Sequence, residues 1–399
     1  MADLYQLSQR PDPTADWRRL RETQISTALL DTSTGQTIPV LARYADVRAA
    51  LHGSGGKDSS YLNRSTLAPL YMPCPEALSI IGELKAEPVT AAGDPPFHPP
   101  MRKMLESVFP WKLNQLPPYH SMIQEIVDDL LGEINDLRTV DLADVLAAEL
   151  PLRVILHLIG APAGDGPMVR AWSDGQIHFI WGRPTPDEQV RVLRNLISFW
   201  EYCLDLVKGD LPRESVTARL MVAGATPNQA ASFAFNLLVA GHETTRSLIA
   251  NMFLLLLQQR DRWERVRAAP ELVPRAVAET SRYMPAIVGW LRETARDVVF
   301  DEATLPAGTR VLLHLGAANR DMPNGDDFDL HARRMKSLSF GVGPHYCIGA
   351  FLAILEAETT LATALRRFPD LELAPGFIPS YPQNLGFRAP RELRVTTGH

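Results

Sequence analysis

Apolar residues recur at helical spacing, three or four positions apart, over most of the middle and C-terminal regions of the chain. Such spacing predicts helices that bury one face. The clearest cases cover residues 123–134, 145–159, 190–206 and 230–257. Short strand-like runs are fewer, and they cover residues 37–41, 298–300, 310–315 and 393–396. This balance predicts a mostly α fold with small peripheral β-sheets.

The longest predicted helix has a clear beginning. Thr226 is a good N-cap residue, Pro227 suits the first helical position, and the apolar pattern continues to about Gln259. Gly241 and a pair of threonines lie near its centre. A glycine there costs about 1 kcal/mol relative to alanine. We therefore expect a functional reason for it and a local irregularity in the helix.

Length and composition favour one large unit. The chain has 399 residues, 46% of them hydrophobic, which is enough to bury a large core. No Gly/Ser linker, low-complexity run or composition shift divides it, so we expect a single domain over residues 1–399. The net charge of −6 disfavours a nucleic-acid partner.

The distribution of apolar residues and cysteines indicates the cellular compartment in which the protein works. Residues 1–22 are polar, and the most apolar stretch, residues 248–257, is too short to span a bilayer. We therefore expect a soluble, cytoplasmic protein with no membrane segment. Cys74, Cys203 and Cys347 are odd in number and far apart, which predicts neither a disulfide framework nor a zinc cluster.

Cys347 lies in a glycine-rich segment, residues 340–349, that reads F-G-V-G-P-H-Y-C-I-G and runs into an apolar helical stretch. The N–H groups and the positive dipole end of a helix favour a thiolate there. Gly341, Gly343 and Gly349 permit positive φ and a close approach of backbone amides to the sulfur. A lone cysteine is more often a buried packing residue, but a thiolate held this way is a strong axial ligand for haem iron.

A second segment, residues 240–245, reads A-G-H-E-T-T in the middle of the longest helix. Glu243 offers a carboxylate that can swing, and the Thr244 hydroxyl can hold a water, so the two side chains can pass protons. The alternative is an ordinary helix with a buried threonine and an exposed glutamate. An H-E-x-x-H zinc motif is excluded because Arg246 occupies the second histidine position.

Two further segments place charged residues at helical spacing. Glu279 and Arg282 are three positions apart, so they can pair on one helix face; a solvated surface pair worth under ~1 kcal/mol is the alternative. His98 and Arg102 are four positions apart and follow Asp94-Pro95-Pro96, so one helix face can present both. Arg292 follows Arg282 by ten positions.

With these four segments, in their order along the chain, the sequence resembles the cytochrome P450 family of haem-thiolate monooxygenases over about residues 35–396. The match is complete for the family's F-x-x-G-x-x-x-C-x-G, A-G-x-[DE]-T-T and E-x-x-R patterns. It departs at D-P-P-x-H-x-x-x-R, where Pro99-Pro100 replaces the usual Thr-Arg. That change alters the predicted start of the helix. The sequence therefore does not fix which group the His98 side chain contacts.

The resemblance implies a role for each matching residue. Cys347 would ligate the iron of haem b, with Phe340 shielding the sulfur, and Glu243 and Thr244 would deliver protons. Glu279 and Arg282 would lock the segment beneath the haem loop, completed by Arg333 or Arg334. The remaining cofactor contacts implied are Ala240, Gly241, Gly341 and Gly349 beside the haem, and His98, Arg102, Arg292 and His345 at its propionates.

The resemblance also implies that four segments form the substrate pocket: about residues 59–90, 172–186, the long-helix face, and strands near 286–291 and 384–388. Each candidate in them has core packing as its alternative. The lining candidates are Asn236, Val239, Ile287, Val288, Trp290, Leu385 and Phe387, and Trp172, Phe179 and Trp181 are candidates for the entrance. This mixture favours a medium-sized, largely apolar or aromatic substrate.

We expect an enzyme that activates O₂ to hydroxylate or otherwise oxidise a small molecule in bacterial natural-product biosynthesis. The chain has no nicotinamide or flavin motif, so ferredoxin and ferredoxin reductase would supply electrons. Their docking surface would be a basic cluster of Arg333, Arg334, Lys336, Arg366 and Arg367. Oxidative radical coupling of aromatic groups without oxygen insertion is an alternative, and a haem-thiolate sensor is a remote one.

Overall fold

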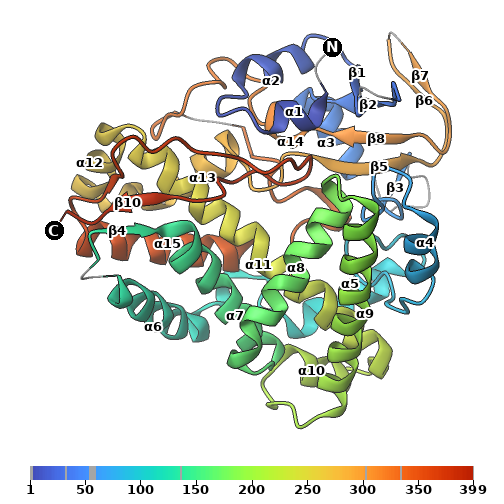
Figure 1. The fold of residues 1–399 in the computed structure, drawn as a ribbon, viewed down its shortest axis with the longest axis horizontal. Coiled ribbons are helices and arrows are strands. Elements are labelled where there is room, and N and C mark those ends of the chain that lie inside the picture. Colours follow the sequence, from blue (N-terminus) through green and yellow to red (C-terminus); the bar gives the residue numbers. More distant parts are fainter. Residues whose placement is uncertain are drawn as a thin grey trace.

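The computed structural model describes residues 3–31, 34–53, 60–134, 137–301, 303–332 and 335–398. Helices dominate it (Figure 1). The α-helices are α1 (Leu4–Ser8), α2 (Thr14–Leu20), α3 (Tyr44–His52), α4 (Pro75–Ile81), α5 (His98–Val108), α6 (Pro117–Glu133), α7 (Glu149–Ile159), α8 (Gly166–Trp181), α9 (Pro186–Lys208), α10 (Val216–Val222), α11 (Pro227–Leu257), α12 (Arg260–Ala268), α13 (Val273–Tyr283), α14 (Leu315–Ala318) and α15 (Ala350–Arg367). Shorter turns are η1 (Leu113–Gln115), the π-helix η2 (Ala143–Ala148), η3 (Ala163–Asp165), η4 (Pro270–Leu272) and η5 (Gly343–His345).

The strands form small sheets at the edges of the helical body (Figure 1). The largest has the order β1 (Ser26–Leu29), β2 (Thr37–Leu41), β8 (Arg310–Leu313), β5 (Trp290–Thr294) and β3 (Tyr61–Leu62). Its neighbours are antiparallel except for β2 and β8, which are parallel. The others are β4 (Thr139–Asp141), β10 (Arg394–Thr396) and β9 (Glu372–Leu373), and the pair β6 (Val298–Val299) and β7 (Thr304–Leu305). The predicted mostly α fold is confirmed.

The central element is α11, which runs through the middle of the molecule (Figure 1). Its predicted start is confirmed: the Thr226 hydroxyl accepts a hydrogen bond from the Gln229 N–H, and the Gln229 side chain accepts one from the Thr226 N–H, each at 3.1 Å. The helix ends at Leu257, two residues before the predicted end. No helix within the described ranges has the length and apolar character that crossing a membrane requires.

Two predicted elements differ in detail. The helix predicted over residues 145–159 is divided into the π-helix η2 and the α-helix α7. The strand predicted over residues 310–315 ends at Leu313, because the His314 ring accepts a hydrogen bond from the Ala317 N–H at 3.0 Å and so caps α14. Local capping by a side chain therefore ends this strand earlier than its apolar pattern indicates.

Gly241 has a packing role that the sequence did not reveal. A Cβ atom at this position would lie 2.9 Å from the Ile155 side chain, so the glycine lets α7 approach α11 closely. The expected irregularity is absent, because α11 is unbroken from Pro227 to Leu257. Thr244 instead donates from its hydroxyl to the Ala240 carbonyl at 2.7 Å within a continuous helix.

Glu279 and Arg282 form a buried pair, not a solvated one. Two hydrogen bonds of 2.7 Å join the guanidinium to the carboxylate, and the side chains are only 2% and 5% exposed. Arg282 also donates to the carbonyls of Gly325 and Asp327, at 2.6 and 2.7 Å. The pair therefore fixes the segment that leads towards the cysteine loop. Arg333 and Arg334, the predicted third members, lie outside the described residues.

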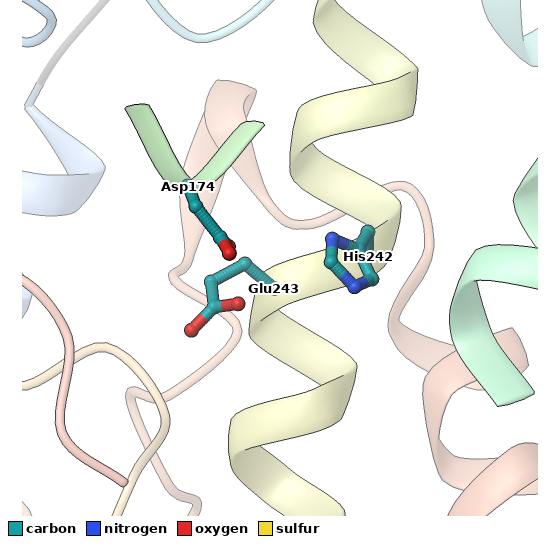
Figure 2. A group of neighbouring side chains, drawn as sticks. All are labelled: Asp174, His242 and Glu243. Carbon is teal, nitrogen blue, oxygen red and sulfur yellow. The ribbon is translucent and has the colours of Figure 1, made fainter. Parts of the chain in front are cut away.

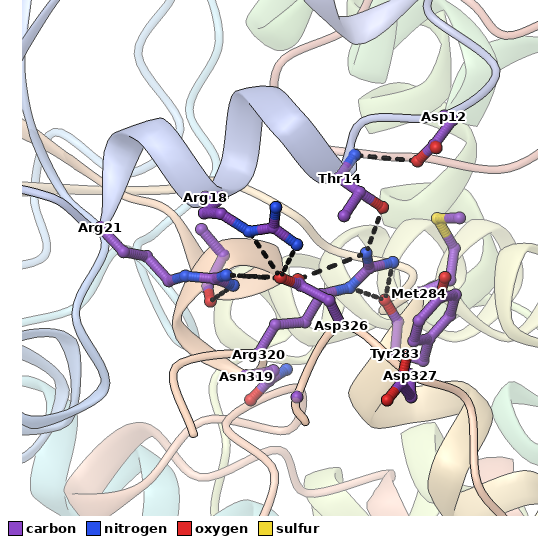
Figure 3. Close-up of polar contacts among 12 residues, drawn as sticks. Asp12, Thr14, Arg18, Arg21, Tyr283, Met284, Asn319, Arg320, Asp326 and Asp327 are labelled. Carbon is purple, nitrogen blue, oxygen red and sulfur yellow. Dashed lines mark hydrogen bonds and ion pairs between the residues drawn. The ribbon is translucent and has the colours of Figure 1, made fainter. Parts of the chain in front are cut away.

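A second polar cluster fastens the N-terminal helix α2 to the same segment (Figure 3). Asp326 accepts hydrogen bonds from Arg18 and Arg21, with shortest distances of 2.9 and 3.0 Å. Arg320 donates to the Tyr283 carbonyl at 2.7 Å and to the Thr14 hydroxyl at 3.1 Å. Together with the buried pair, these contacts join α2, α13 and the chain between α14 and the cysteine loop.

Replacing Arg282 with methionine is expected to lower the free energy of unfolding by about 3–5 kcal/mol, since it leaves Glu279 as an uncompensated buried charge. Denaturant unfolding followed by circular dichroism measures this. Arg194→Met is the control, because Arg194 pairs with Glu76 at the surface with side chains 67% and 59% exposed. Equal, small losses in both variants would show that the buried pair is not a structural anchor.

Candidate active site

The residues of the four sequence segments meet around one internal cavity of about 310 Å³. The lining includes the middle of α11 and the cysteine loop with the start of α15. Ala240 is exposed although it sits in the centre of the longest helix, because it opens onto this cavity. The predicted residues in the lining are His98, Arg102, Ala240, Gly241, Thr244, Arg292, Phe340, Gly341, His345, Cys347 and Gly349.

Backbone contacts set the shape of the cysteine loop. The Cys347 N–H donates to the Phe340 carbonyl at 2.8 Å, which closes the loop. Gly341 and Gly343 adopt φ values of 69° and 76°, in the region that favours glycine. Gly349 does not, since its φ is −87° and it serves as the N-cap of α15. The prediction of positive φ is therefore correct for two of the three glycines.

Burial dominates the electrostatics of the Cys347 thiol, which faces the cavity. Burial raises its pKa, and the Gly349 N–H and the Arg102 guanidinium lower it by less. The expectation that the loop favours the thiolate therefore stays a prediction. A metal ion bound on the cavity side would favour the ionised sulfur.

A cluster of cationic and imidazole side chains lines the same cavity. The rings of His98 and His345 stack with centroids 4.0 Å apart, and Asn63 hydrogen-bonds the His345 ring at 2.9 Å. Arg102 pairs with Glu106 at 2.6 Å and remains partly exposed. Arg292, on β5, is 1% exposed and donates to the Leu291 carbonyl at 2.8 Å. Pro99 and Pro100 fit the first turn of α5, so His98 and Arg102 still share one helix.

The charge of this cluster comes from its arginines. Burial, followed by the charge of Arg102, lowers the pKa of His98. Burial, followed by the neighbouring His98 and Arg292, lowers the pKa of His345 to about 3. Burial lowers the pKa of Arg292 only to about 10, so it stays charged. Two guanidinium charges and two imidazoles therefore line the cavity, a set suited to a group that carries carboxylates.

Thr244 and Glu243 face different ways across α11. Thr244 lines the cavity, whereas Glu243 is 8% exposed and lies outside the lining. Both carboxylate oxygens of Glu243 accept hydrogen bonds from Arg246, at 3.0 and 3.1 Å. Burial raises the pKa of Glu243, and Arg246 opposes that rise. Sequence reasoning gave Arg246 no such role and missed Asp174, which lies beside Glu243 and His242 (Figure 2).

The substrate segments come together as predicted, with differences among individual residues. Asn236, Val239, Ile287, Trp290, Phe387 and Trp181 line the cavity. Val288 lines a separate small cavity beside α1, and Leu385 packs in the core, where its N–H donates to the Trp181 carbonyl at 3.1 Å. Trp172 stacks on Phe199, and Phe179 packs edge-on against Tyr71.

Some lining residues were not named individually from the sequence, although they lie within the predicted segments. They come from α8 and from the connection between α4 and α5. Gln176, Ile177 and Ile180 precede Trp181 on α8, and Val89 and Thr90 lie before α5. Helical periodicity could have identified Ile177, because it lies four positions before Trp181 on the same helix. Gln176 carries no such signal.

The residues present fit an iron porphyrin with two carboxylates. A thiol on the wall supplies a soft axial ligand, and Arg102 and Arg292 can balance two negative charges that would be expensive to bury alone. Phe340, Leu352 and Ala353 add apolar surface to the lining.

Comparisons with known proteins agree with this geometry. The family described as cytochrome P450 matches residues 222–390. Cytochrome P450 107B1 of Saccharopolyspora erythraea is 35% identical over 292 residues, 70% of this chain and 70% of that protein. Vitamin D(3) 25-hydroxylase of Pseudonocardia autotrophica is 33% identical over 351 residues, 84% of this chain and 82% of that protein. The solved structure of cytochrome P450 CREJ in complex with (4-ethylphenyl) dihydrogen phosphate has a TM-score of 0.88, 31% identity and 98% coverage of both chains.

Sequence, fold and cavity thus agree. A relative that is 35% identical over 70% of both chains, together with a solved structure that superposes over almost the whole chain, is sufficient to assign the family. The chain belongs to the cytochrome P450 family, whose members are haem-containing monooxygenases.

Proposed function

We propose that this enzyme uses haem b, O₂ and electrons from ferredoxin and ferredoxin reductase to oxidise an uncharged, largely apolar or aromatic small molecule, in bacterial natural-product biosynthesis. The observation that carries the proposal is that Cys347 and Thr244 line one cavity. We further propose that the chain works as a single domain in the cytoplasm. Support for one domain comes from a hydrophobic core that extends from Leu4 to Val395.

Haem supplies the reduction and activation of O₂ when it is bound. In this proposal Cys347 ligates its iron and Phe340 covers the sulfur. Arg102 and Arg292 neutralise the two propionates, while His98 and His345 donate N–H groups to them. Burial lowers the pKa of both imidazoles, that of His345 to about 3, which favours their neutral forms.

Thr244 and Glu243 handle protons in this proposal. The Thr244 hydroxyl donates to the Ala240 carbonyl at 2.7 Å. Its oxygen can still accept a hydrogen bond from a water on the cavity side. Glu243 has a raised pKa and can hold a proton behind the helix wall. Bulk water is kept from the reacting centre because α11 and its buried neighbours separate the two sides.

The lining of the cavity indicates the substrate class. Among the described lining residues, imidazole and guanidinium groups occur only in the cluster of His98, Arg102, Arg292 and His345. The solved CREJ complex holds a phosphate ester of an alkylphenol; here the cationic cluster is assigned to haem, so the alkylphenol part is the better guide. Trp181 and Trp290 stack at 5.6 Å and offer an aromatic wall.

Two amides supply the polar contacts. The Asn236 amide nitrogen donates to the Ser232 carbonyl at 2.7 Å, which leaves its oxygen as an acceptor. The Gln176 oxygen has no hydrogen-bond partner among the described residues. Acceptors of this kind favour a substrate that carries a hydroxyl or N–H group. Oxygen insertion is preferred to radical coupling because the acid–alcohol pair is intact and a relative is named as a hydroxylase.

With ¹⁸O₂, an alkylphenol-type substrate and a surrogate ferredoxin system, the wild-type enzyme is expected to give product with one labelled oxygen atom. Thr244→Ala should lower product per reducing equivalent about tenfold and release hydrogen peroxide, because water is no longer held in place for proton transfer. Mass spectrometry and a peroxide assay measure both.

Thr244→Ser, which keeps the hydroxyl, is the matched control and should retain most of the coupling. Unlabelled coupled products from the wild type would overturn oxygen insertion in favour of radical coupling. Unchanged coupling in Thr244→Ala would remove Thr244 from proton delivery.

Electron delivery is proposed to occur at the surface beside the cysteine loop, where the route to Cys347 is shortest. Lys336 is exposed there and lies over the Tyr346 ring at 5.4 Å. Arg366 is exposed at the far end of α15, and Arg367 is half-buried and pairs with Asp128. Arg333 and Arg334, the other predicted members of this basic cluster, lie outside the described residues. An acidic ferredoxin would be steered to these charges against the chain's own net charge of −6.

The double variant Lys336→Glu and Arg366→Glu should reduce the rate of haem reduction by ferredoxin about tenfold at low salt, with substrate affinity unchanged. Stopped-flow absorbance at several salt concentrations measures this rate. Lys208→Glu on α9, an exposed charge reversal, should have little effect. Reduction that neither salt nor the double variant slows would place the donor elsewhere.

A further inference from the structure

A buried amide, the side chain of Asn63, lies behind the imidazole and guanidinium cluster of the cavity. Asn63 directly follows β3 and is 0% exposed although it is polar. Its side-chain nitrogen hydrogen-bonds an oxygen of the Asp94 carboxylate at 2.9 Å and Nε2 of His345 at 2.9 Å. One amide nitrogen therefore joins a carboxylate to a ring that lines the cavity.

The contact with Asp94 fixes which way the amide is turned. The backbone N–H groups of Asn63 and Arg64 donate to the same carboxylate, at 2.9 and 3.0 Å, so Asp94 acts there as an acceptor. A carboxylate that accepts attracts the NH₂ group of the amide, whereas the opposite orientation would place the amide oxygen against a carboxylate oxygen. The atom between Asp94 and His345 is therefore the nitrogen.

The orientation of the amide in turn fixes where the His345 ring carries its hydrogen. The Asn63 nitrogen has two hydrogens, and it meets two partners, the Asp94 oxygen and the His345 Nε2 atom. A ring nitrogen can accept an N–H bond only if it carries no proton itself. An imidazole that accepts at Nε2 carries its proton at Nδ1. These hydrogen bonds therefore select the Nδ1–H tautomer of His345.

Asp94 also holds the neighbouring histidine. Its backbone carbonyl accepts hydrogen bonds from the N–H groups of Phe97 and His98, at 3.1 and 3.0 Å, where α5 begins. The His98 ring stacks on His345 with an interplanar angle of 26°. The side chain of Asp94 therefore orients one imidazole through Asn63, and its carbonyl anchors the residue that carries the other.

Further contacts hold the turn that contains Asn63. The Asn63 carbonyl accepts a hydrogen bond from the Thr66 N–H at 2.8 Å, and the Thr66 hydroxyl accepts one from Arg292 at 3.3 Å. The Arg64 side chain pairs with Glu293 on β5. The turn is thus fastened to the strand that carries Arg292, which keeps the Asn63 amide beside the His345 ring.

We propose that Asn63 is a positioning residue that fixes His345 as the Nδ1–H tautomer, so that this ring donates a hydrogen bond to a haem carboxylate. The inference rests on the haem contact of His345 in the proposed function. A haem carboxylate is an acceptor, so a ring with Nδ1–H stabilises it, whereas a ring with its proton at Nε2 would present a lone pair. Asp94 contributes by holding the amide in the orientation that donates to the ring.

NMR of ¹⁵N-histidine-labelled enzyme reads the tautomer directly, because a ring nitrogen with a proton and one without resonate far apart. The haem-loaded ferrous carbonyl form is diamagnetic, and the His345 signals are identified by their loss in His345→Gln. The wild type should show Nδ1 protonated and Nε2 unprotonated. Asn63→Leu, which is similar in size but has no amide, should show both tautomers.

Arg64→Met is the matched control. It removes the side-chain pair with Glu293 from the same turn but keeps the Asn63 amide and Asp94. This variant should retain the wild-type tautomer. Haem transfer to excess apomyoglobin should be about tenfold faster in Asn63→Leu than in the wild type or Arg64→Met, since the carboxylate loses an oriented donor.

Three results would each overturn the role of Asn63: a protonated Nε2 in the wild type, the Nδ1–H tautomer alone in Asn63→Leu, or equal haem loss from Asn63→Leu and Arg64→Met. The wild-type spectrum decides the tautomer even where Asn63→Leu does not fold. None of these measurements uses substrate or turnover. A wild-type enzyme that inserts no labelled oxygen would therefore refute the proposed oxygen insertion and leave the assignment of His345 standing.

Discussion

The thiol of Cys347, which opens onto the cavity, is the group on which the rest of this structure depends. Desolvation raises its pKa, and the Gly349 N–H and Arg102 lower it by less. A metal ion that shares the charge of the sulfur would favour the thiolate. The cavity, the two arginines and the apolar lining are then explained together, because they complement a charged, planar iron cofactor.

The scaffold keeps this loop in position with buried polar contacts. The Glu279–Arg282 pair binds carbonyls of the segment before the loop, and Asp326 joins that segment to α2. Across the cavity, Gly241 lets α7 pack against α11. The same helix then divides two environments, with Thr244 on the cavity side and Glu243 behind it. Position on α11 therefore separates a residue that lines the cavity from one that is buried outside it.

Much of this architecture could be predicted from the sequence, because capping and periodicity are local. Thr226 and Pro227 marked the start of α11, and short motifs marked the loop. Contacts between distant segments could not be predicted: Gly241 reflects packing against Ile155, Asp174 reaches Glu243 from another helix, and the pKa of Cys347 depends on burial by the whole fold. Val288 lies away from the cavity although its neighbour Ile287 lines it, since successive residues of extended chain point to opposite sides. Leu385 packs in the core instead.

The most direct test of the central claim is the absorption spectrum of the ferrous carbonyl complex in Cys347→His, with Cys203→Ser as the control. Cys203 is fully buried and does not line the cavity. The account predicts a thiolate-type spectrum in the wild type and in Cys203→Ser, and its loss in Cys347→His. A thiolate-type spectrum that persists in Cys347→His would contradict the assignment of Cys347 as the iron ligand.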